Sequence, residues 1–363
     1  MTLQLSRRSL LRALAAAPVA VFTSRGSTSA QEVSAPVSNN VWAAITGPIA
    51  DSVADLPPRV YVPHENGGDV VVIDPTTRQI VDRFSVGRVP HHVTPAYDLS
   101  RLYVSVMGAS RLVEIDIRAG RPVRSIGVAT PYNLYFSPDG SLAIVASEPN
   151  NRLDFFDPIT WRPVARLPIR ASGIDHLDFS ADGQSLLVSA EFSGHVVRVD
   201  LEQLAVSGIL AVGGLPIDIK LAPDGDVFYV ANQGRHGVSI IDADALREVG
   251  FLRTGRGAHG LAISRDTRAL YVSNRIEGSI SVIDFASREV VDRWSIGGSP
   301  DMLQVSPDGT ELWASGRSHG AVYVVDTISG VLLERIRTGA APHGLTYFPQ
   351  PGRVCLGHNG VYR

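Results

Sequence analysis

Histidine is the residue type of this chain with the most to offer chemically. There are ten histidines in 363 residues, and two of them, His91 and His92, are adjacent. An uncharged imidazole is a common transition-metal ligand and a competent general base near neutral pH. The single cysteine, Cys355, excludes an internal disulfide and any multi-cysteine metal cluster. Whether the histidines can act together depends on the elements that carry them.

A repeat of about 42 residues runs through most of the chain. Each unit contains a short β-rich run that ends in aspartate, such as VVVID or VSIID. The aspartates, 41 to 43 residues apart, are Asp74, Asp116, Asp157, Asp200, Asp242, Asp284 and Asp326. Each unit holds four short apolar runs separated by polar loops and Pro-Asp-Gly-type turns, with no helical periodicity. This pattern is typical of a β-propeller blade.

The strands of a blade are named a to d from the channel outward. The a strands are expected near 91–96, 132–137, 175–180, 217–222, 259–264, 301–306 and 343–348. The chain begins with strands b, c and d of one blade, and its last a strand can complete that blade and close the ring. The sequence therefore predicts an all-β fold, a seven-bladed propeller of four-stranded antiparallel blades. The alternative is eight blades, built from an extra run at 353–356 with help from 41–46.

The first 30 residues predict a signal peptide. They contain no acid, begin with the arginine pair Arg7-Arg8, continue with an apolar run and end in small residues. The pair favours a twin-arginine signal over an ordinary one. We expect residues 31–58 to be a lead-in, residues 59–363 to be a single propeller domain with a short C-terminal tail, and the protein to be periplasmic or extracellular. Removal of residues 1–30 changes the formal charge from −3 to −7.

The b strands and a–b turns carry a family resemblance. RVYVPH, RLYVSV, FYVAN and LYVSN, with turns such as SPDG and APDG, resemble the YVTN-repeat β-propeller family over about residues 59–348. The resemblance implies a propeller scaffold, some of whose exported members are implicated in binding. Related propellers include haem-binding nitrite reductase domains, the copper-cluster propeller of nitrous oxide reductase, and lactonases and lyases. None of their catalytic motifs recurs here as a matched string, so the resemblance implies fold more than function.

The propeller pattern gathers all ten histidines on one face. The d–a and b–c loops share this face, which we call the top face. His64, His195, His236, His319 and His358 fall in b–c loops or the equivalent tail position, and the other five begin a strands beside the channel. The first two positions of the a strands predict a ligand-binding channel mouth of His91, His92, Tyr132, Asn133, Asp175, His176, Asp218, His259, Asp301 and His343. The candidate metal ligands among them are His91, His92, His176, His259 and His343.

Two functions, from different classes, follow. In the first, the channel mouth and top face bind a small molecule or a protein partner. The alternative is a periplasmic enzyme, either an oxidoreductase with a transition-metal or haem-type cofactor on the histidines or a lactonase- or lyase-type hydrolase with histidine as general base. Two structural explanations compete with both functions. The histidines could be loop residues that form hydrogen bonds without a metal, and the loop charges could form a rim that is merely solvated. The acidic net charge argues against a nucleic-acid partner. The apolar run of the leader is too short to span a membrane, and we expect a monomer.

Two conspicuous features have structural explanations instead. The periodic aspartates are expected to cap the backbone of the c–d turns. Cys355 lies in an apolar run without a partner, which favours burial over nucleophilic chemistry.

Overall fold

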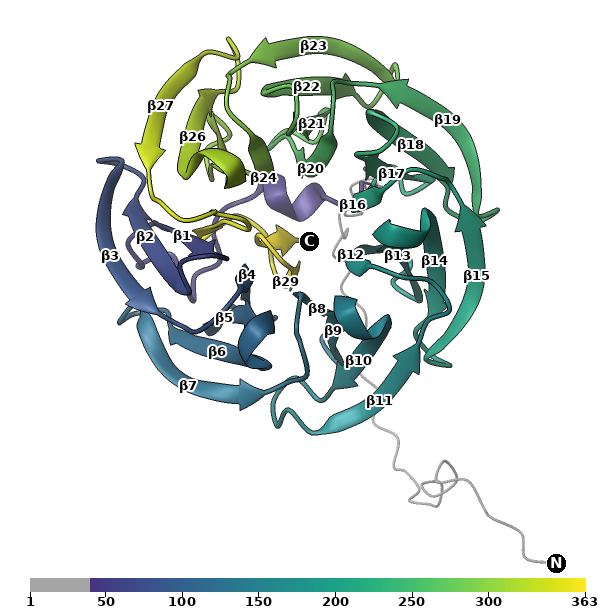
Figure 1. The fold of residues 1–363 in the computed structure, drawn as a ribbon, viewed down its shortest axis with the longest axis horizontal. Coiled ribbons are helices and arrows are strands. Elements are labelled where there is room, and N and C mark those ends of the chain that lie inside the picture. The colour runs from purple at the N-terminus through teal and green to yellow at the C-terminus, as the bar shows by residue number, and fades with distance from the viewer. Residues whose placement is uncertain (1–39) are drawn as a thin grey trace, which may run out of the picture. The chain divides into compact units, whose positions relative to one another are not determined.

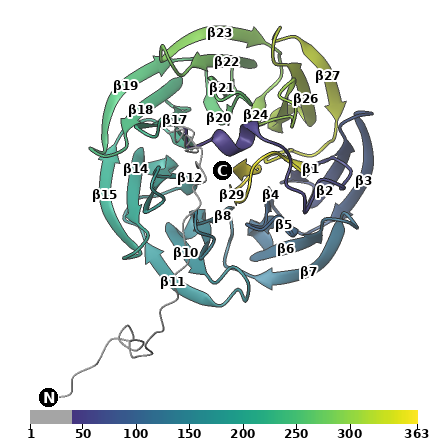
Figure 2. The ribbon, with the colours of Figure 1, turned by 180° about the vertical axis from the view of Figure 1, so that it is seen from behind.

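Seven antiparallel sheets form a ring around a central channel (Figures 1 and 2). The computed structural model describes residues 40–363, so the predicted leader, residues 1–30, and the first part of the lead-in lie outside the described residues. Besides strands, residues 40–363 form only short 3₁₀ helices. The prediction of a seven-bladed propeller is confirmed.

Each blade contains four strands of an antiparallel meander, which are successive in the chain except in blade 1. Blade 1 consists of β28 (Thr346–Phe348), β1 (Arg59–His64), β2 (Asp69–Asp74) and β3 (Gln79–Ser85). Blade 2 consists of β4 (Pro90–Pro95), β5 (Arg101–Val106), β6 (Arg111–Asp116) and β7 (Arg121–Gly127). Blade 3 consists of β8 (Asn133–Phe136), β9 (Ala143–Ser147), β10 (Arg152–Phe156) and β11 (Pro163–Pro168). Blade 4 consists of β12 (Ile174–Phe179), β13 (Ser185–Ala190), β14 (His195–Asp200) and β15 (Ala205–Ala211).

The remaining blades repeat this order. Blade 5 consists of β16 (Pro216–Leu221), β17 (Val227–Asn232), β18 (Gly237–Asp242) and β19 (Arg247–Arg253). Blade 6 consists of β20 (Ala258–Ile263), β21 (Ala269–Asn274), β22 (Ser279–Asp284) and β23 (Glu289–Ser295). Blade 7 consists of β24 (Pro300–Val305), β25 (Glu311–Gly316), β26 (Ala321–Asp326) and β27 (Leu332–Arg337). Short 3₁₀ helices occupy four of the b–c loops: η2 (Met107–Ala109), η3 (Glu148–Asn150), η4 (Glu191–Ser193) and η5 (Arg317–His319).

The ring closes within blade 1, as expected. Strand β28 near the C-terminus pairs with β1 through Arg59 opposite Phe348 and Tyr61 opposite Thr346. The expected strand 343–348 begins three residues later than expected, so His343 precedes it in an irregular segment. The blades pack through apolar strand residues, which are buried on both sheet faces and therefore show little alternation.

The periodic aspartates cap the c–d turns. The Asp74 carboxylate accepts a hydrogen bond from the backbone N–H of Thr76 at 2.9 Å, and Asp326 accepts one from Ser329 at 2.7 Å. The other five aspartates make the same kind of contact. The sequence-based explanation of the repeat is therefore correct.

The eight-blade alternative is wrong, because the C-terminal segment turns inward instead of starting another blade. Strands β29 (Cys355–Gly357) and β30 (Val361–Tyr362) form a hairpin on the channel side of β8, which makes blade 3 a six-stranded sheet. These strands have three and two residues, too few for a blade. Cys355 is buried, as expected, and burial raises the pKa of its thiol.

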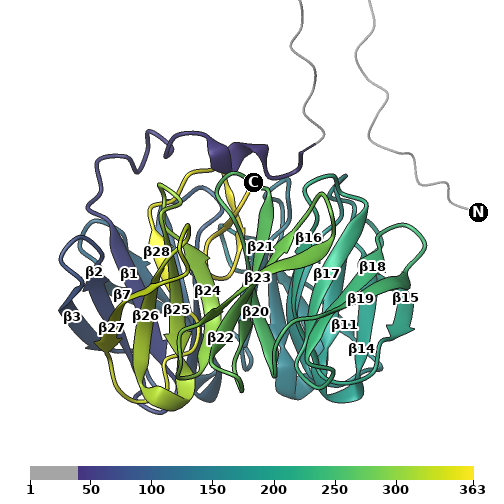
Figure 3. The same cartoon turned by 90° about the horizontal axis from the view of Figure 1, so that it is seen from above.

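The lead-in covers the end of the channel away from the top face. It contains η1 (Ala43–Thr46) and crosses the ring (Figure 3). The indole N–H of Trp42 donates to the carbonyl of Leu221, the last residue of β16, at 2.9 Å. Residues 41–46 thus plug the channel and add no strand. No helix among residues 40–363 has the length and apolar character needed to cross a bilayer.

Candidate functional site

A β-bulge at the start of most innermost strands sets the geometry of the channel mouth. In β4, Pro90 lies opposite Val106 and Val93 opposite Val104, so the inner strand carries one extra residue. The same irregularity occurs at the start of β12, β16, β20 and β24. A bulge re-aims side chains and breaks strict alternation. It therefore lets both members of a pair such as His91 and His92 face the channel.

The structure brings the five candidate metal ligands into one connected group. His343 is central: its ring centroid lies 5.1 Å from that of His91, 4.8 Å from His92 and 6.1 Å from His259. His92 in turn lies 5.2 Å from His176. All five side chains are buried.

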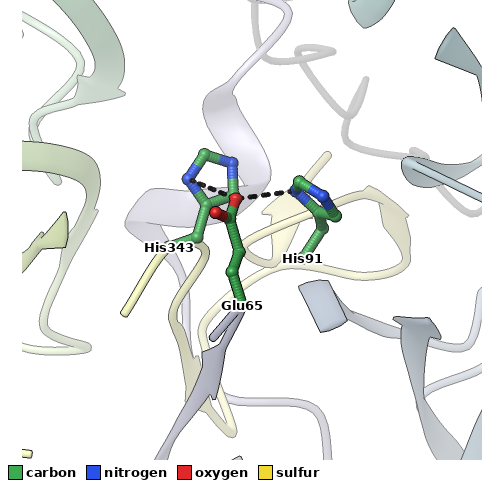
Figure 4. A group of neighbouring side chains, drawn as sticks. All are labelled: Glu65, His91 and His343. Atoms are coloured by element: carbon green, nitrogen blue, oxygen red, sulfur yellow. Dashed lines mark ion pairs between the residues drawn. The ribbon is translucent and has the colours of Figure 1, made fainter. Parts of the chain in front are cut away.

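The first set of contacts, which we call the mouth cluster, consists of Glu65, His91, His259, Asp301 and His343. Nδ1 of His91 lies 3.2 Å and Nδ1 of His343 lies 3.9 Å from Oε1 of Glu65 (Figure 4). Asp301 bridges two imidazoles, with Oδ2 at 2.9 Å from Nδ1 of His343 and Oδ1 at 3.1 Å from Nδ1 of His259. Two carboxylates and three imidazoles thus converge at the top of the channel.

Two arginines balance the carboxylates of the mouth cluster. Arg317 contacts Glu65, and Nη1 of Arg275 lies 2.9 Å from Asp301. Burial raises the pKa of Glu65 more than Arg317 lowers it. Burial alone would also raise the pKa of Asp301, but the hydrogen bond from Arg275 and the charges of Arg275 and Arg317 hold the pKa of this carboxyl below its usual value.

The second set, the inner cluster, consists of His92, Asn133, His176, Asp218 and His358. Nδ1 of His176 lies 3.1 Å from Nε2 of His358 and 3.1 Å from the amide nitrogen of Asn133. Each of these two imidazoles lies 3.8 Å from Oδ1 of Asp218. The carboxylate of Asp218 also accepts a hydrogen bond from the only lysine of the chain, Lys220, at 3.1 Å.

The clustered imidazoles are held in the neutral form. Burial lowers the pKa of each of them well below its ordinary value, and neighbouring cations lower it further. The group consists of His91, His92, His176, His259, His343 and His358. A neutral imidazole has a lone pair for a metal, so no proton has to be removed from a cationic ring before ligation.

The other predicted residues of the mouth divide into two groups. The Tyr132 ring packs against the histidines, with its centroid 4.6 Å from that of His91 and 5.6 Å from that of His176. Asp175 faces Glu148 and Glu191 instead of the imidazoles. Four of the loop histidines stay outside the channel clusters: His64, which pairs with Asp69 at 2.7 Å, and His195, His236 and His319.

Sequence reasoning misses the roles of Glu65 and His358 at the centre of the site. The repeat pattern places Glu65 only among the loop charges of the rim, and His358 only in a loop. A signal for Glu65 exists in the register, because it is the first residue after a b strand. The equivalent residues around the ring are Glu65, Met107, Glu148, Glu191, Gln233, Arg275 and Arg317. No comparable signal places His358, since the tail leaves the repeat pattern.

The donor set fits a metal ion better than a tetrapyrrole. Neighbouring imidazole centroids lie 4.6 to 6.3 Å apart, so the rings pack on one another and leave no space between them for a macrocycle. A single ion needs only converging donor atoms. Buried nitrogens without any hydrogen-bond partner include both ring nitrogens of His91 and Nε2 of His92 and His176. Such orphaned groups are expensive, at about 1–3 kcal/mol each, unless a ligand satisfies them.

Comparison with known proteins gives the family. A family model for YNCE-like β-propellers matches residues 19–351. The chain belongs to the YNCE-like β-propeller family. No sequence among functionally curated proteins matches this YNCE-like propeller.

Solved structures share the fold of this YNCE-like propeller at low identity. Hydrazine synthase from Kuenenia stuttgartiensis matches with a TM-score of 0.67 and 20% identity, covering 78% of this chain and 99% of that one. A functionally unknown protein from Desulfotomaculum acetoxidans matches with a TM-score of 0.71 and 18% identity, covering 81% and 99%. The dihydro-heme d1 dehydrogenase NirN matches with a TM-score of 0.61 and 17% identity, covering 79% and 74%. At these identities the likeness supports the fold alone.

Proposed function

We propose that this protein binds a divalent transition-metal ion in the mouth cluster and uses that site to bind a ligand at its top face. The observation that carries the proposal is the pair Glu65 Oε1 and His91 Nδ1. They lie 3.2 Å apart and are both buried, yet neither has a hydrogen-bond partner. Both atoms can therefore direct a lone pair at a third group, such as a metal ion, placed between them.

The spacing of the donors suits a metal. Ligands at about 2.0–2.1 Å from a tetrahedral ion stand about 3.3 Å from one another. The contacts of Glu65 with His91 and His343, at 3.2 and 3.9 Å, bracket this value. One donor atom each from Glu65, His91 and His343 lies within 4.8 Å of the other two, and water or a ligand would complete the shell of the ion. Two imidazoles and one carboxylate form a mixed nitrogen–oxygen set of the kind that Zn²⁺, Co²⁺ and related ions accept.

The charge balance of the mouth cluster determines which ligand a bound ion would attract. The two carboxylates of the mouth cluster, Glu65 and Asp301, are already matched by Arg317 and Arg275. A divalent ion gives the buried mouth a net positive charge, which favours an anionic or electron-rich ligand arriving at the top face. The metal thus connects our two hypotheses, because the ion that defines the binding site could also act as a Lewis acid.

The hydrolase alternative has less support from the geometry. The pair Asp301–His343 resembles an oriented general base, since a carboxylate lies at one ring nitrogen. Both side chains are fully buried, and Nε2 of His343 faces the hydroxyl of Tyr132 at 3.5 Å. A substrate would have to displace Tyr132 to reach this nitrogen.

The proposal includes a location outside the cytoplasm. It rests on the leader predicted from residues 1–30, of which the arginine pair favours the twin-arginine route. Export of a folded protein allows a metal to be bound before translocation. Retention of a reporter fusion in the cytoplasm would contradict this part of the proposal without touching the metal site.

Metal analysis of His91→Ala/His343→Ala tests the site directly. We expect the unaltered protein, purified from its exported form, to carry about one transition-metal ion per chain, and the double variant to carry none. After chelation, Co²⁺ titrated into the unaltered protein should restore a visible absorption band that the double variant lacks. The measurements are elemental analysis and absorption spectroscopy.

The matched control is His319→Ala. This histidine lies on the same face, is exposed and contacts Ser299 instead of the channel residues. It should leave metal content unchanged. Metal-free unaltered protein that also rejects Co²⁺, or a folded double variant that keeps its metal, would overturn the proposal.

A further inference from the structure

Three carboxyl groups meet on the side of the channel mouth formed by blades 3 and 4. Glu148 begins η3, Glu191 begins η4, and Asp175 lies in β12. One oxygen from each lies within 4.8 Å of the others. No metal candidate from the histidine clusters belongs to this group, which we call the carboxyl cluster.

Asp175 is the member that needs an explanation. Its side chain is 0% exposed, and neither carboxylate oxygen accepts a hydrogen bond from an N–H group or pairs with a cation among the described residues; the side chain within hydrogen-bonding reach is another acid, Glu191. Buried carboxylates are ordinarily paired with a cation or with N–H donors, because an unpaired buried charge is costly. The side chains grouped with Asp175 are instead two further acids, Glu148 and Glu191.

The equivalent position in blade 7 shows what a satisfied site looks like. Asp301 lies at the start of β24 as Asp175 lies at the start of β12, and both are fully buried. The two residues that follow the neighbouring b strands are arginines around Asp301, namely Arg275 and Arg317, but glutamates around Asp175. The same scaffold positions therefore carry opposite charges. Around Asp301 the protein supplies two arginines as counter-cations. Around Asp175 it supplies two acids, so a bound cation would have to provide the positive charge.

Two of the three acids of the carboxyl cluster are partly exposed to solvent. Glu148 and Glu191 are only partly buried and lie on the b–c loops of the top face. An ion from solvent would therefore meet the carboxylates of Glu148 and Glu191 before that of Asp175, whose side chain is fully buried.

We propose that Glu148, Asp175 and Glu191 form a second cation site that takes a hard divalent ion, Ca²⁺. The donors are oxygens only, which suits Ca²⁺ and not the softer ions that prefer imidazole. Ca²⁺ binds oxygens at about 2.3–2.6 Å, so ligands on opposite sides of the ion stand about 5 Å apart. A spacing within 4.8 Å fits that shell, which water would complete. The site shares no residue with the mouth cluster.

Calorimetric titration with Ca²⁺ tests this site in the full chain. We expect one Ca²⁺ to bind per chain at neutral pH. Asp175→Asn keeps the size of the side chain but removes its charge, and it should weaken Ca²⁺ binding at least about tenfold, since even outer-shell ligand partners commonly cost that much. Glu148→Gln, on a loop where folding is not at stake, should weaken binding in the same direction.

Two controls separate this proposal from others. Glu202→Gln changes an exposed acid in the c–d turn of blade 4 and should leave Ca²⁺ affinity unchanged. His91→Ala/His343→Ala should lose its transition metal but keep Ca²⁺, so failure of one site is distinguishable from failure of the other. The absence of Ca²⁺ binding by the unaltered protein would overturn the proposal and indicate that the three carboxyl groups share protons instead. Unchanged affinity in folded Asp175→Asn and Glu148→Gln would place the ion elsewhere.

Discussion

At the scale of single residues, the channel mouth concentrates groups that are costly to bury. Six imidazoles lie together with their pKa values lowered, mainly by burial. The three acids of the carboxyl cluster have raised pKa values, again mainly through burial, and that of Glu148 is about 7. The free energy of unfolding of the metal-free protein is therefore expected to depend on pH.

The sign of this dependence follows from proton linkage. A histidine whose folded-state pKa is depressed takes up its proton in the unfolded chain near pH 6.5 but not in the folded one. The stability is thus present above about pH 6.5 and is lost as the pH falls, by up to about 1.4 kcal/mol per pH unit for each such histidine. The raised pKa values of the carboxyl cluster and of Glu65 act in the opposite sense, but four acids oppose six histidines.

We therefore expect the metal-free protein to lose stability between about pH 7.5 and about pH 5.5, on either side of the ordinary histidine pKa. Urea unfolding at several pH values measures it. His92→Asn removes one fully buried imidazole and should make the dependence shallower. An unchanged pH dependence in folded His92→Asn would mean that this imidazole titrates in the folded protein as it does in the unfolded chain.

The residues of the mouth were largely within reach of the sequence, because a repeat makes equivalent positions converge on one axis. His91, His92, His176, His259 and His343 could be placed together for this reason. Which imidazole meets which carboxylate could not be predicted. Those pairings depend on bulge geometry and on side-chain directions that differ from blade to blade.

At the scale of elements, the C-terminal hairpin is as important to the site as any blade. It carries His358 into the inner cluster, and Asn359 contacts His92 at 3.3 Å. The sequence suggests a b strand there, because a short apolar run after an a strand is what every earlier repeat shows. The hairpin instead pairs with the inner strand β8, a tertiary contact that no local pattern encodes.

Arg363 anchors this hairpin to the plugged end of the channel. Its guanidinium donates to Asp178 at 3.1 Å and to the carbonyl of Phe179 at 3.0 Å, and it lies 4.9 Å from the centre of the Trp42 ring. Hydrogen bonds to charged groups contribute about 1.5–3 kcal/mol. We expect Arg363→Ala to loosen residues 355–363 and to speed amide hydrogen exchange there, measured by mass spectrometry.

Arg353→Ala is the control for this prediction, because Arg353 is an exposed arginine of the same segment. It should leave exchange in the hairpin unchanged. Equal protection of residues 355–363 in both variants would show that β29 and its pairing with β8 hold the hairpin without the arginine.

At the scale of the whole molecule, the ring depends on one closure. The repeat count predicts it, since the chain starts at a b strand and supplies the missing a strand near its end. The packing that supports it lies between blades 7 and 1, where Trp313 is fully buried among residues such as Val60, Val62 and Leu345. Its ring meets that of Tyr347, on the closing strand β28, edge to face at 5.9 Å.

Trp313→Ala should therefore weaken the closure itself. Loss of a buried tryptophan costs about 3–5 kcal/mol through lost burial and the cavity left behind. Because β28 is short and is held by few backbone pairs, we expect faster hydrogen exchange in β28, β1 and blade 7, while blades 3 to 5 keep their protection. Denaturant unfolding and hydrogen exchange measure the two effects.

Ile328→Ala is the matched surface change for this test, since Ile328 is an apolar residue of blade 7 that is 88% exposed. It should alter the free energy of unfolding by no more than about 0.5 kcal/mol. If Trp313→Ala lowered protection evenly in all seven blades, the propeller would unfold as one cooperative unit in which no interface is privileged. Loss of protection confined to blades 1 and 7 would instead identify the closure as the place where the ring opens first. Glu65 and His343 of the mouth cluster lie beside that closure, so the cluster would lose its metal at the same step.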